Sequence, residues 1–418
     1  MSPIINRKDF LQSTVLNPGR IIWPEWMPRL AFSPAQVEPR GDTLVVVFLR
    51  GAADALNMVV PHGESAYYAA RPTIHIPRPD DRRSAAGERV IDLDGFFGLH
   101  PTLKPLLPSW QEGHLAVVHA CGAPDESRSH FKAMELMERG VSDEGGPASG
   151  WIGRHLATYN TGNPSPLRAI GLGEMLPRSL YGAVPASALR SIIDFHLSGD
   201  TKAAGQMQAA LRVFYQGTDA VSRVGQETLA ILNTIEALNP AGYRSKSEPS
   251  YPASEFGSGL QQIAMLVKAE VGLEVAAIDV GGWDTHFAQG SSQGLMAGLM
   301  SNLAQGLAAF HADLHAHQDR LTVVVMSEFG RRVNENASLG TDHGYGSLML
   351  LMGANILGGQ VHTDWPGIQA GQLFGPGDLA VTTDYRDVLA EIISKRLGNQ
   401  ALGEIFPGYT PALRGIAR

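Results

Sequence analysis

Two short motifs in the second half of the chain place a carboxylate and an imidazole close together beside glycines. The segment "GGWDTH" carries Asp284 and His286, and the segment "GTDHG" carries Asp342 and His343. Mixed carboxylate and imidazole ligands suit Zn²⁺ or Mn²⁺ better than Ca²⁺, which prefers shells made of oxygen alone. The chemistry that these residues predict is the binding of a divalent cation and, through it, of an anionic group.

Each motif also fits a purely structural role. An Asp that follows Gly-Gly commonly caps a helix, and Asp and Gly are ordinary turn residues, so Asp284 and "GTDHG" need no ligand. Ser129 in "SRSHF" can satisfy a free amide at the start of a helix over 130–139. The same position suits a nucleophile, because a helix N-terminus stabilises an anion. Asp54 in "RGAADALN" fits a helix cap equally well.

The candidate residues lie between apolar, β-branched runs that alternate with amphipathic stretches. These runs and stretches are the predicted strands and helices that position them. The runs lie at 42–51, 114–122, 167–173, 273–282, 321–330 and 348–353. Such alternation predicts a doubly wound α/β fold, with a mostly parallel sheet and helices on both faces. Residues 200–272 are helical in period without an interposed strand, which predicts a helical insertion. We therefore expect one α/β domain over 41–418.

Polar residues gather directly after these runs, where ligands bind in open parallel sheets. They are Arg50, Asp54, Asn57, Asp125, Ser127, Arg128, Ser129, His130, Asp284, His286, Glu328, Arg331, Arg332, Asp342 and His343. The sequence predicts that Asp54, Ser129, Asp284, His286, Glu328 and His343 converge on one cavity. By contrast, His311 and His315 have the i, i+4 spacing of metal ligands, but their polar neighbours favour a solvated helix face.

Composition narrows the class of ligand. The 41 acidic against 33 basic residues give a formal net charge of −8, so no basic excess exists to bind nucleic acid or an anionic membrane surface. No apolar run approaches the length that spans a bilayer. The single cysteine, Cys121, cannot form a disulfide within the chain. Any phosphate or sulfate ligand would therefore need a local positive site, such as a metal or the N-terminus of a helix.

The N-terminal segment has the outline of a twin-arginine export signal. It carries Arg7-Lys8 in place of an Arg pair, and Pro18, Arg20 and Glu25 interrupt the stretch that should be apolar. We expect residues 1–40 to be a degenerate signal that stays on the protein as an extended arm, and export to be weak. An irregular N-terminal segment is the alternative.

Several segments in a fixed order resemble one family. They are "LVVVFLRGAADALNMVVP", "IDLDGFFGLHPTLKPLLPSW", "SRSHFKAMELMERG", "GGWDTH", "VVVMSEFGRR", "GTDHGYG" and "TTDYRDVLAEII". From about residue 40 onward they resemble the bacterial domain of unknown function 1501 family, which commonly carries a twin-arginine signal. The resemblance implies a periplasmic or cell-surface location, whereas a non-functional signal would leave the chain in the cytoplasm. That family is similar to the alkaline phosphatase and sulfatase superfamily, in which an α/β core holds one or two divalent metals beside a nucleophile.

The resemblance implies a metal-ligand set and a nucleophile. Asp54 resembles the aspartate after the first strand that ligates metal, and Asp284 with His286 resembles an aspartate-histidine pair. His343 resembles the last histidine ligand, with Asp342 beside it. Ser129 takes the place of the nucleophile at a helix start, and Ser127 is a rival.

One position departs from the pattern of the superfamily. In "SEFG", Glu328 is the carboxylate of an expected Asp-His pair, and Phe329 stands where the histidine would be. This removes a nitrogen ligand and puts a second metal, or all metal binding, in doubt.

Three functions compete. The first is a metal-dependent hydrolase of phosphate or sulfate esters, in which guanidinium and amide groups hold the substrate anion. The predicted substrate contacts are Arg50, Asn57, Arg128 and Arg331. The second is a binding or scaffold protein that has lost catalysis, which Phe329 favours. The third is a mutase that moves a phosphoryl group, with 200–272 as its lid.

Overall fold

The computed structural model describes residues 42–184, 186–197, 201–245 and 248–418. The predicted N-terminal arm, residues 1–40, lies outside these ranges. The central sheet contains β1 (Thr43–Leu49), β5 (Leu115–Gly122), β6 (Ala169–Leu172), β7 (Ser187–Leu189), β8 (Val275–Val280), β9 (Leu321–Ser327), β10 (Ser347–Met352), β11 (Val361–His362) and β12 (Thr383–Asp384). A small second sheet contains β2 (Val59–Val60), β3 (Ile91–Asp92) and β4 (Gly98–Leu99).

The helices fall into two groups by length. The longer α-helices are α5 (His130–Arg139), α6 (Trp151–Thr158), α7 (Thr201–Phe214), α8 (Ala220–Leu238), α9 (Glu255–Lys268), α10 (Leu295–Asp313) and α11 (Tyr385–Lys395). The short ones are α2 (Ala55–Met58), α3 (Ser65–Ala70), α4 (Leu107–Gln111) and α12 (Leu402–Ile405). The 3₁₀ segment η2 (Pro101–Leu106) precedes α4 and packs against α10.

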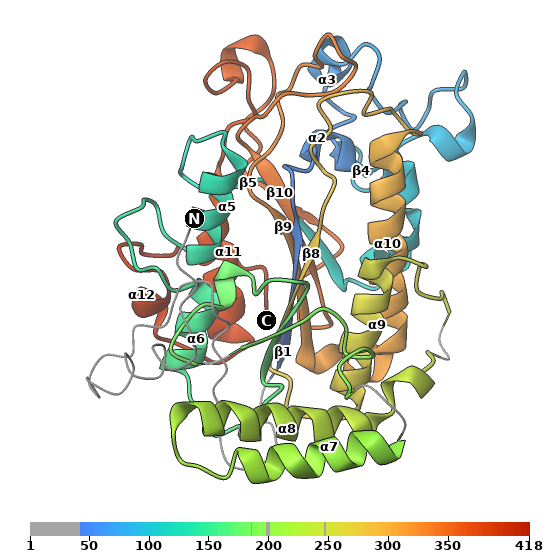
Figure 1. The fold of residues 1–418 in the computed structure, drawn as a ribbon. Coiled ribbons are helices and arrows are strands. Elements are labelled where there is room, and N and C mark those ends of the chain that lie inside the picture. Colours follow the sequence, from blue (N-terminus) through green and yellow to red (C-terminus); the bar gives the residue numbers. More distant parts are fainter. Residues whose placement is uncertain (1–41, 185, 198–200, 246–247) are drawn as a thin grey trace, which may run out of the picture.

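The central strand β1 shows how the sequence builds two layers of helices on one sheet. All seven of its residues are buried, and successive side chains point to opposite faces. Val45 and Val47 pack in the core that contains residues of α9 and α10, whereas Val46 packs in the core that contains residues of α6 and α11. Figure 1 shows α9 and α10 on one side of the sheet and α5, α6 and α11 on the other. The predicted α/β class with helices on both faces is confirmed.

The strand order is β11-β5-β10-β9-β1-β8-β6-β7, with β12 also paired to β5. β1 is parallel to both β8 and β9, as predicted for the runs at 42–51, 273–282 and 321–330. The prediction that the 114–122 run is their direct neighbour is wrong, because β10 lies between β5 and β9 and is antiparallel to both. The 328–346 connection contains no helix, so the chain turns back into an antiparallel neighbour instead of crossing over to a parallel one. β5 still runs in the same direction as β9, so its carboxyl end reaches the same edge.

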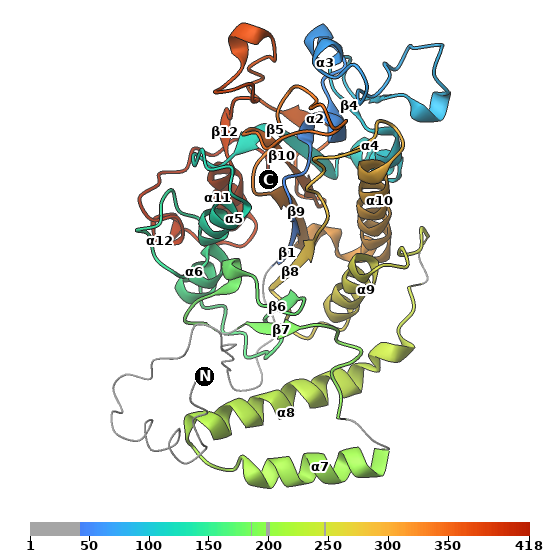
Figure 2. The ribbon, with the colours of Figure 1, turned by 45° about the horizontal axis from the view of Figure 1, so that its top comes forward.

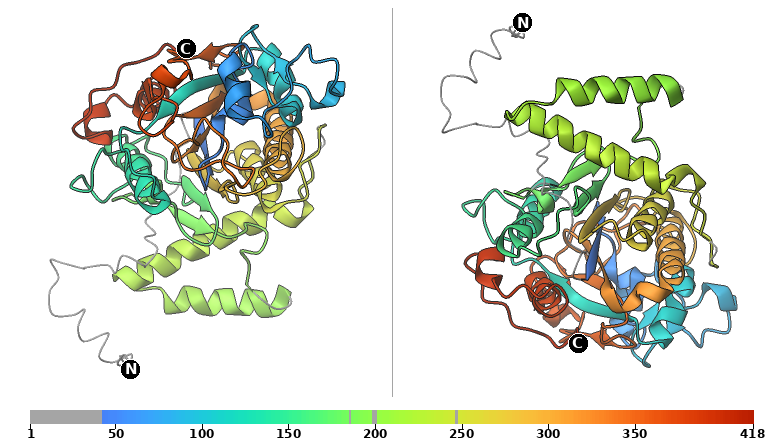
Figure 3. Two further views of the ribbon diagram at one scale, coloured as in Figure 1. Left: turned by 90° about the horizontal axis from the view of Figure 1, so that it is seen from above. Right: turned by 90° about the horizontal axis from the view of Figure 1, so that it is seen from below.

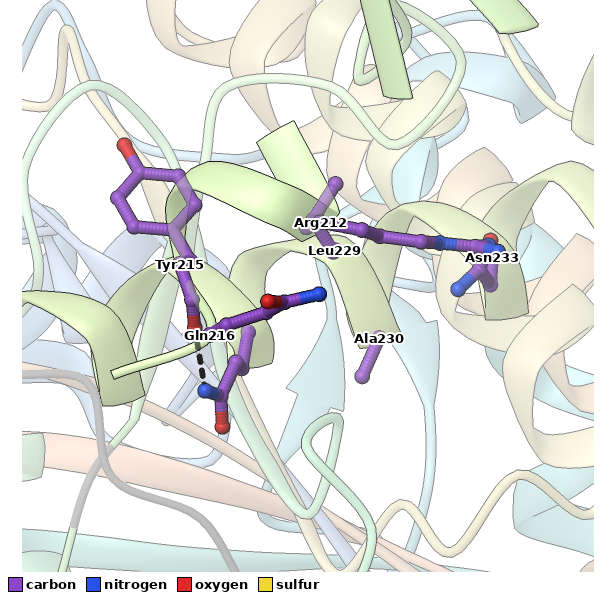
Figure 4. A pocket seen from close by; sticks show the side chains of 7 residues that line it. Arg212, Tyr215, Gln216, Leu229, Ala230 and Asn233 are labelled. Atoms are coloured by element: carbon purple, nitrogen blue, oxygen red, sulfur yellow. Dashed lines mark hydrogen bonds between the residues drawn. The ribbon is translucent and has the colours of Figure 1, made fainter. Parts of the chain in front are cut away.

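Helices α7 and α8 lie at the amino ends of the strands. Figures 1 and 2 show this hairpin beneath the sheet, and Figure 3 shows it projecting beside the main body. A pocket of ≈ 380 Å³ opens on the hairpin and is lined by Arg212, Tyr215, Gln216, Gln226, Leu229, Ala230 and Asn233 (Figure 4). The lid of the mutase hypothesis would have to cover the carboxyl edge, whereas α7 and α8 lie at the opposite end of the sheet. α9, also within 200–272, packs against α10 and β8.

None of the helices in the described part of the chain is both long enough and apolar enough to span a bilayer.

Buried histidines make stability depend on pH. The His119 ring is fully buried, with Nε2 3.0 Å from the Val59 carbonyl oxygen and Nδ1 accepting a hydrogen bond from the Ala120 N–H. Burial lowers the pKa of His119 to about 4, and it does the same for His100 and His155. In the unfolded chain these three imidazoles bind protons with the ordinary pKa of about 6.5. The stability that the folded protein gains by holding them neutral is therefore complete above pH 6.5 and is lost as the pH falls to 4.

We predict that the free energy of unfolding decreases steadily from pH 6.5 to pH 4. Urea unfolding at half-unit pH steps measures it. The variant His119→Gln should give a shallower pH slope than the wild type, whereas the exposed control His196→Gln should keep the wild-type slope. Equal slopes for all three proteins would contradict the assignment.

Candidate metal centre

Four chain segments meet at the carboxyl edge of the sheet. They are the turn after β1, the loop after β8, the loop between β9 and β10, and the first residue of α5. Glycines allow the backbones to approach closely. A Cβ on Gly51, whose φ is +117°, would lie 2.5 Å from the Asp284 backbone nitrogen, and one on Gly340 would lie 2.4 Å from the His286 carbonyl carbon. The glycines of "RG" and "GTDHG" are therefore required by contacts between loops far apart in the sequence.

The side chains of these segments form one cluster around a carboxylate oxygen. Asp284 Oδ1 lies 3.2 Å from His286 Nε2, 3.2 Å from His343 Nε2 and 3.5 Å from His130 Nε2. The Nε2 atoms of His286 and His343 lie 2.8 Å apart. The structure thus brings together three predicted site residues and adds His130. We define these four residues as the histidine–aspartate cluster.

His130 is held by Glu328. The Nδ1 atom of His130 lies 2.7 Å from Glu328 Oε1, which also accepts a 2.8 Å hydrogen bond from the Gly51 N–H. Burial tends to raise the pKa of Glu328, but the hydrogen bonds from His130 and the backbone hold it below its usual value. The same hydrogen bond, which the His130 ring donates to Glu328, raises the pKa of His130. Glu328 is therefore an anionic partner behind the ring, in contrast to its predicted role as a direct metal ligand.

The imidazoles of His343 and His286 also face an outer acceptor with their Nδ1 atoms, as His130 does. His343 Nδ1 lies 2.8 Å from the Arg128 carbonyl oxygen, and His286 Nδ1 lies 3.4 Å from Asp342 Oδ1. Metal-binding histidines commonly donate their other ring N–H to a carbonyl or carboxylate, which fixes the tautomer and the direction of the ring. In all three rings Nδ1 faces an outer anchor and Nε2 faces Asp284.

The residues present fit a borderline divalent cation. Ligand atoms of His130, Asp284 and His343 all lie within 4.8 Å of one another. The Nε2 atom of His130 is buried and has no hydrogen-bond partner. Asp284 Oδ1, His286 Nε2 and His343 Nε2 lie 2.8–3.2 Å from one another, and these atoms together with His130 Nε2 would hold one such cation.

Arg331 holds the carboxylate. Its Nη2 lies 2.6 Å from Asp284 Oδ1, and its side chain is fully buried. Although burial opposes it, the hydrogen bond from Arg331 lowers the pKa of Asp284 to about 2. Asp284 is therefore ionised at any physiological pH. The predicted role of Arg331 as a substrate contact is replaced in the structure by this positioning role.

Phe329 packs behind the imidazoles. It is buried, its ring stacks on His130 with centroids 5.0 Å apart, and it contacts His343 at 5.1 Å. The imidazole of His130, the first residue of α5, thus lies directly beside the position where the resemblance implies a histidine. In the sequence, His130 appears only as one of several polar residues after a strand, and no ligand spacing marks it.

Asp54 and Asn57 lie in a separate buried network. Both Asp54 oxygens accept hydrogen bonds from Arg71, at 2.6 and 2.9 Å, and Oδ2 also accepts one of 2.7 Å from Gln289. Asn57 Oδ1 accepts from Arg71 and Tyr67, each at 2.7 Å. Since these acceptors are already used inside the core, the structure does not bring Asp54 or Asn57 into the histidine–aspartate cluster.

Arg50 also points elsewhere. Its guanidinium forms ion pairs of 3.0 Å with Glu138 and 2.9 Å with Asp279. Arg128 remains nearer the cluster through its backbone contact with His343, and its one-third-exposed side chain pairs with the buried Asp378.

Ser129 directly precedes His130. Its hydroxyl is on an exposed residue at the N-cap of α5 and makes no capping hydrogen bond, while its carbonyl accepts the Ala133 N–H. Ser127 Oγ accepts a 3.2 Å hydrogen bond from the Ser129 N–H. The Ser129 hydroxyl is therefore not used by the helix.

Comparisons with known proteins identify a family and a distant fold likeness. A family model described as "Protein of unknown function (DUF1501)" matches residues 42–396, most of the chain, which confirms the family predicted from the motifs. Among curated proteins, no sequence matches this chain significantly.

Three solved structures are similar at low identity. The zinc complex of the C-terminal periplasmic domain of EptC from Escherichia coli has a TM-score of 0.38 and 10% identity, over 94% of this chain and 93% of that one. The PsFucS1 sulfatase from Pseudoalteromonas sp. has a TM-score of 0.35 and 11% identity, over 91% and 74%. The alkaline phosphatase from the Antarctic bacterium TAB5 has a TM-score of 0.31 and 8% identity, over 75% and 92%. The likeness to all three is distant.

We predict that Glu328→Gln weakens Zn²⁺ binding about 10–100-fold, because it removes the anion that orients and polarises His130. Competition with a chromophoric chelator measures the affinity. Asp342→Asn is the matched control and should have a smaller effect, since the Asp342–His286 distance is longer, at 3.4 Å. Equal losses in the two variants, or none in Glu328→Gln, would contradict the orienting role.

We predict that Asp54→Asn lowers stability while leaving the metal content of the folded protein unchanged. Removing one partner of a buried ion pair leaves the other charge uncompensated and typically costs about 3–5 kcal/mol. Urea unfolding and elemental analysis of the same preparation report the two effects. Loss of bound metal at unchanged stability would instead support Asp54 as a ligand.

Proposed function

Given that the chain belongs to the DUF1501 family, whose description assigns no activity, we propose from its site that it is a hydrolase of phosphate or sulfate esters that depends on a divalent cation. The ligands are Asp284 Oδ1 and the Nε2 atoms of His130, His286 and His343, and Zn²⁺ or Mn²⁺ is the expected ion. The carrying observation is the common orientation of the three imidazoles, with Nδ1 anchored outward and Nε2 directed at one carboxylate oxygen.

A bound cation supplies neutralisation of a phosphoryl or sulfuryl oxygen and lowers the pKa of a coordinated hydroxyl or water. The chain's own residues supply access and positioning. About half of the Asp284 side chain and 41% of that of His286 are exposed, so a substrate group reaches the cluster from solvent.

Ser129 is the proposed nucleophile. It lies one residue before a metal ligand, and its hydroxyl is free of capping contacts. The N-terminus of α5, a helix of ten residues, favours an anion at this point because its first N–H groups have no partner inside the helix. Arg128, one residue earlier, is partly exposed and can donate N–H groups to a substrate oxygen.

A second candidate is a metal-dependent anion-binding protein without turnover. Two observations favour it. Asp54 forms a buried ion pair with Arg71 and is not available as a metal ligand, and Arg331 already neutralises part of the Asp284 charge. The mutase alternative loses its main support, because the α7–α8 hairpin lies at the other end of the sheet (Figure 1).

We predict that Ser129→Ala retains stoichiometric metal but loses about 10³-fold or more of the hydrolysis rate, as expected for removal of a nucleophile. Asp284→Ala should lose both metal and activity. The assay uses 4-nitrophenyl phosphate and 4-nitrophenyl sulfate with metal content measured in parallel.

Ser127→Ala is the matched control and should retain activity. If Ser127→Ala lost activity and Ser129→Ala did not, Ser127 would be the nucleophile instead of Ser129. Absence of hydrolysis by a fully metal-loaded wild type would contradict the hydrolase and favour the binding protein.

A further inference from the structure

A second group of metal-binding side chains lies outside the histidine–aspartate cluster. Glu112 and His114 lie in the turn between α4 and β5, and His311 lies in the last turn of α10. Their ligand atoms all lie within 4.8 Å of one another. The expectation that His311 lies on a solvated helix face is wrong: His311 is 8% exposed, and its Nε2 atom lies 3.2 Å from His114 Nδ1.

This group lies at the opposite edge of the sheet. Leu115, the first residue of β5, is level with Met352 at the end of β10, which pairs in turn with Val323 near the start of β9. His114 is therefore at the amino edge, whereas the histidine–aspartate cluster is at the carboxyl edge. The 3₁₀ segment η2, which directly precedes α4, packs against α10, and the turn after α4 brings His114 Nδ1 to 3.2 Å from His311 Nε2.

The distances suit a shared ion better than hydrogen bonds alone. His114 Nδ1 lies 3.2 Å from His311 Nε2 and 3.5 Å from Glu112 Oε2, and His311 Nε2 lies 3.9 Å from the same oxygen. A point equidistant from three atoms with these separations lies about 2.1 Å from each, which is the bond length that Zn²⁺ makes to imidazole and carboxylate ligands. Without an ion, the carboxylate is at or beyond the limit of hydrogen bonding to either ring.

We propose that Glu112, His114 and His311 bind a second divalent cation of borderline softness, with Zn²⁺ as the best match. Two imidazoles and one carboxylate are a ligand set that zinc favours, and one position remains for water. The site fastens the end of α10 to the turn that starts β5. Since it lies at the far edge from the histidine–aspartate cluster, the proposal stands whether or not the proposed hydrolase activity does.

The test isolates this site in the whole 418-residue chain. Asp284→Ala with His343→Ala removes the histidine–aspartate cluster, and the protein is stripped with chelator and titrated with Zn²⁺ alone. We expect one Zn²⁺ per chain to bind to this double variant and to raise its Tm. Further substitution by His114→Asn or by Glu112→Gln should abolish both the bound equivalent and the shift in Tm.

Glu112→Gln keeps the test decisive if a histidine variant fails to fold, because the Glu112 side chain is half exposed. His315→Gln is the matched control, one helical turn beyond His311 and exposed, and should leave binding unchanged. Failure of the double variant to bind Zn²⁺ would overturn the proposal. So would binding that survives both His114→Asn and Glu112→Gln.

Discussion

The buried guanidinium of Arg331 holds the site together. Its Nε donates to the Ala52 carbonyl and its Nη1 to the Thr341 carbonyl, at 2.7 and 2.9 Å. Its Nη2 lies near the carbonyls of Gly51 and Trp283 and against Asp284. One side chain thus ties together the loops after β1, after β8 and before β10. Its loss would leave several buried carbonyls without donors, each at a cost of about 1–3 kcal/mol.

Two sets of residues surround the Asp284 carboxylate that Arg331 holds. The Nε2 atoms of the imidazoles surround Asp284, while Glu328, Asp342 and the Arg128 carbonyl hold the Nδ1 atoms from outside. The rings are therefore already directed before any ion arrives, which reduces the ordering that binding requires. Phe329 fills the space behind two of the rings and excludes water there. The residue that looks like a lost ligand in the sequence contributes by packing.

Much of this arrangement follows from local sequence patterns. Runs such as "TLVVVFL" predict strands buried on both faces, and the parallel pairs of β1 with β8 and β9 are confirmed. Since parallel strands end at a common edge, Asp284, His286 and His343 were expected to meet, and they do. The antiparallel direction of β10 was missed, because an apolar run shows burial but not direction.

The remaining errors involve partners distant in sequence or space. The position of Asp54 after a strand predicts a metal ligand. In the structure, Arg71, which follows α3, donates hydrogen bonds to both of its carboxylate oxygens. His130 carries no ligand spacing, and its role depends on Glu328, 198 residues further along the chain. His311 looks solvated from its neighbours in sequence, but its environment is set by packing against the α4–β5 turn. The periodicity of apolar residues predicts which face of a helix or strand a residue lies on. It does not predict which residue, distant in the sequence, will contact it.

We infer that one cation binds between Asp284 and the three imidazoles. Anomalous diffraction at the zinc edge from crystals of the Zn²⁺-loaded protein tests it most directly. We predict a peak within bonding distance of Asp284 Oδ1 and of the Nε2 atoms of His130, His286 and His343. A metal-loaded crystal with no peak at these atoms, or with the ion beside Asp54 instead, would contradict it.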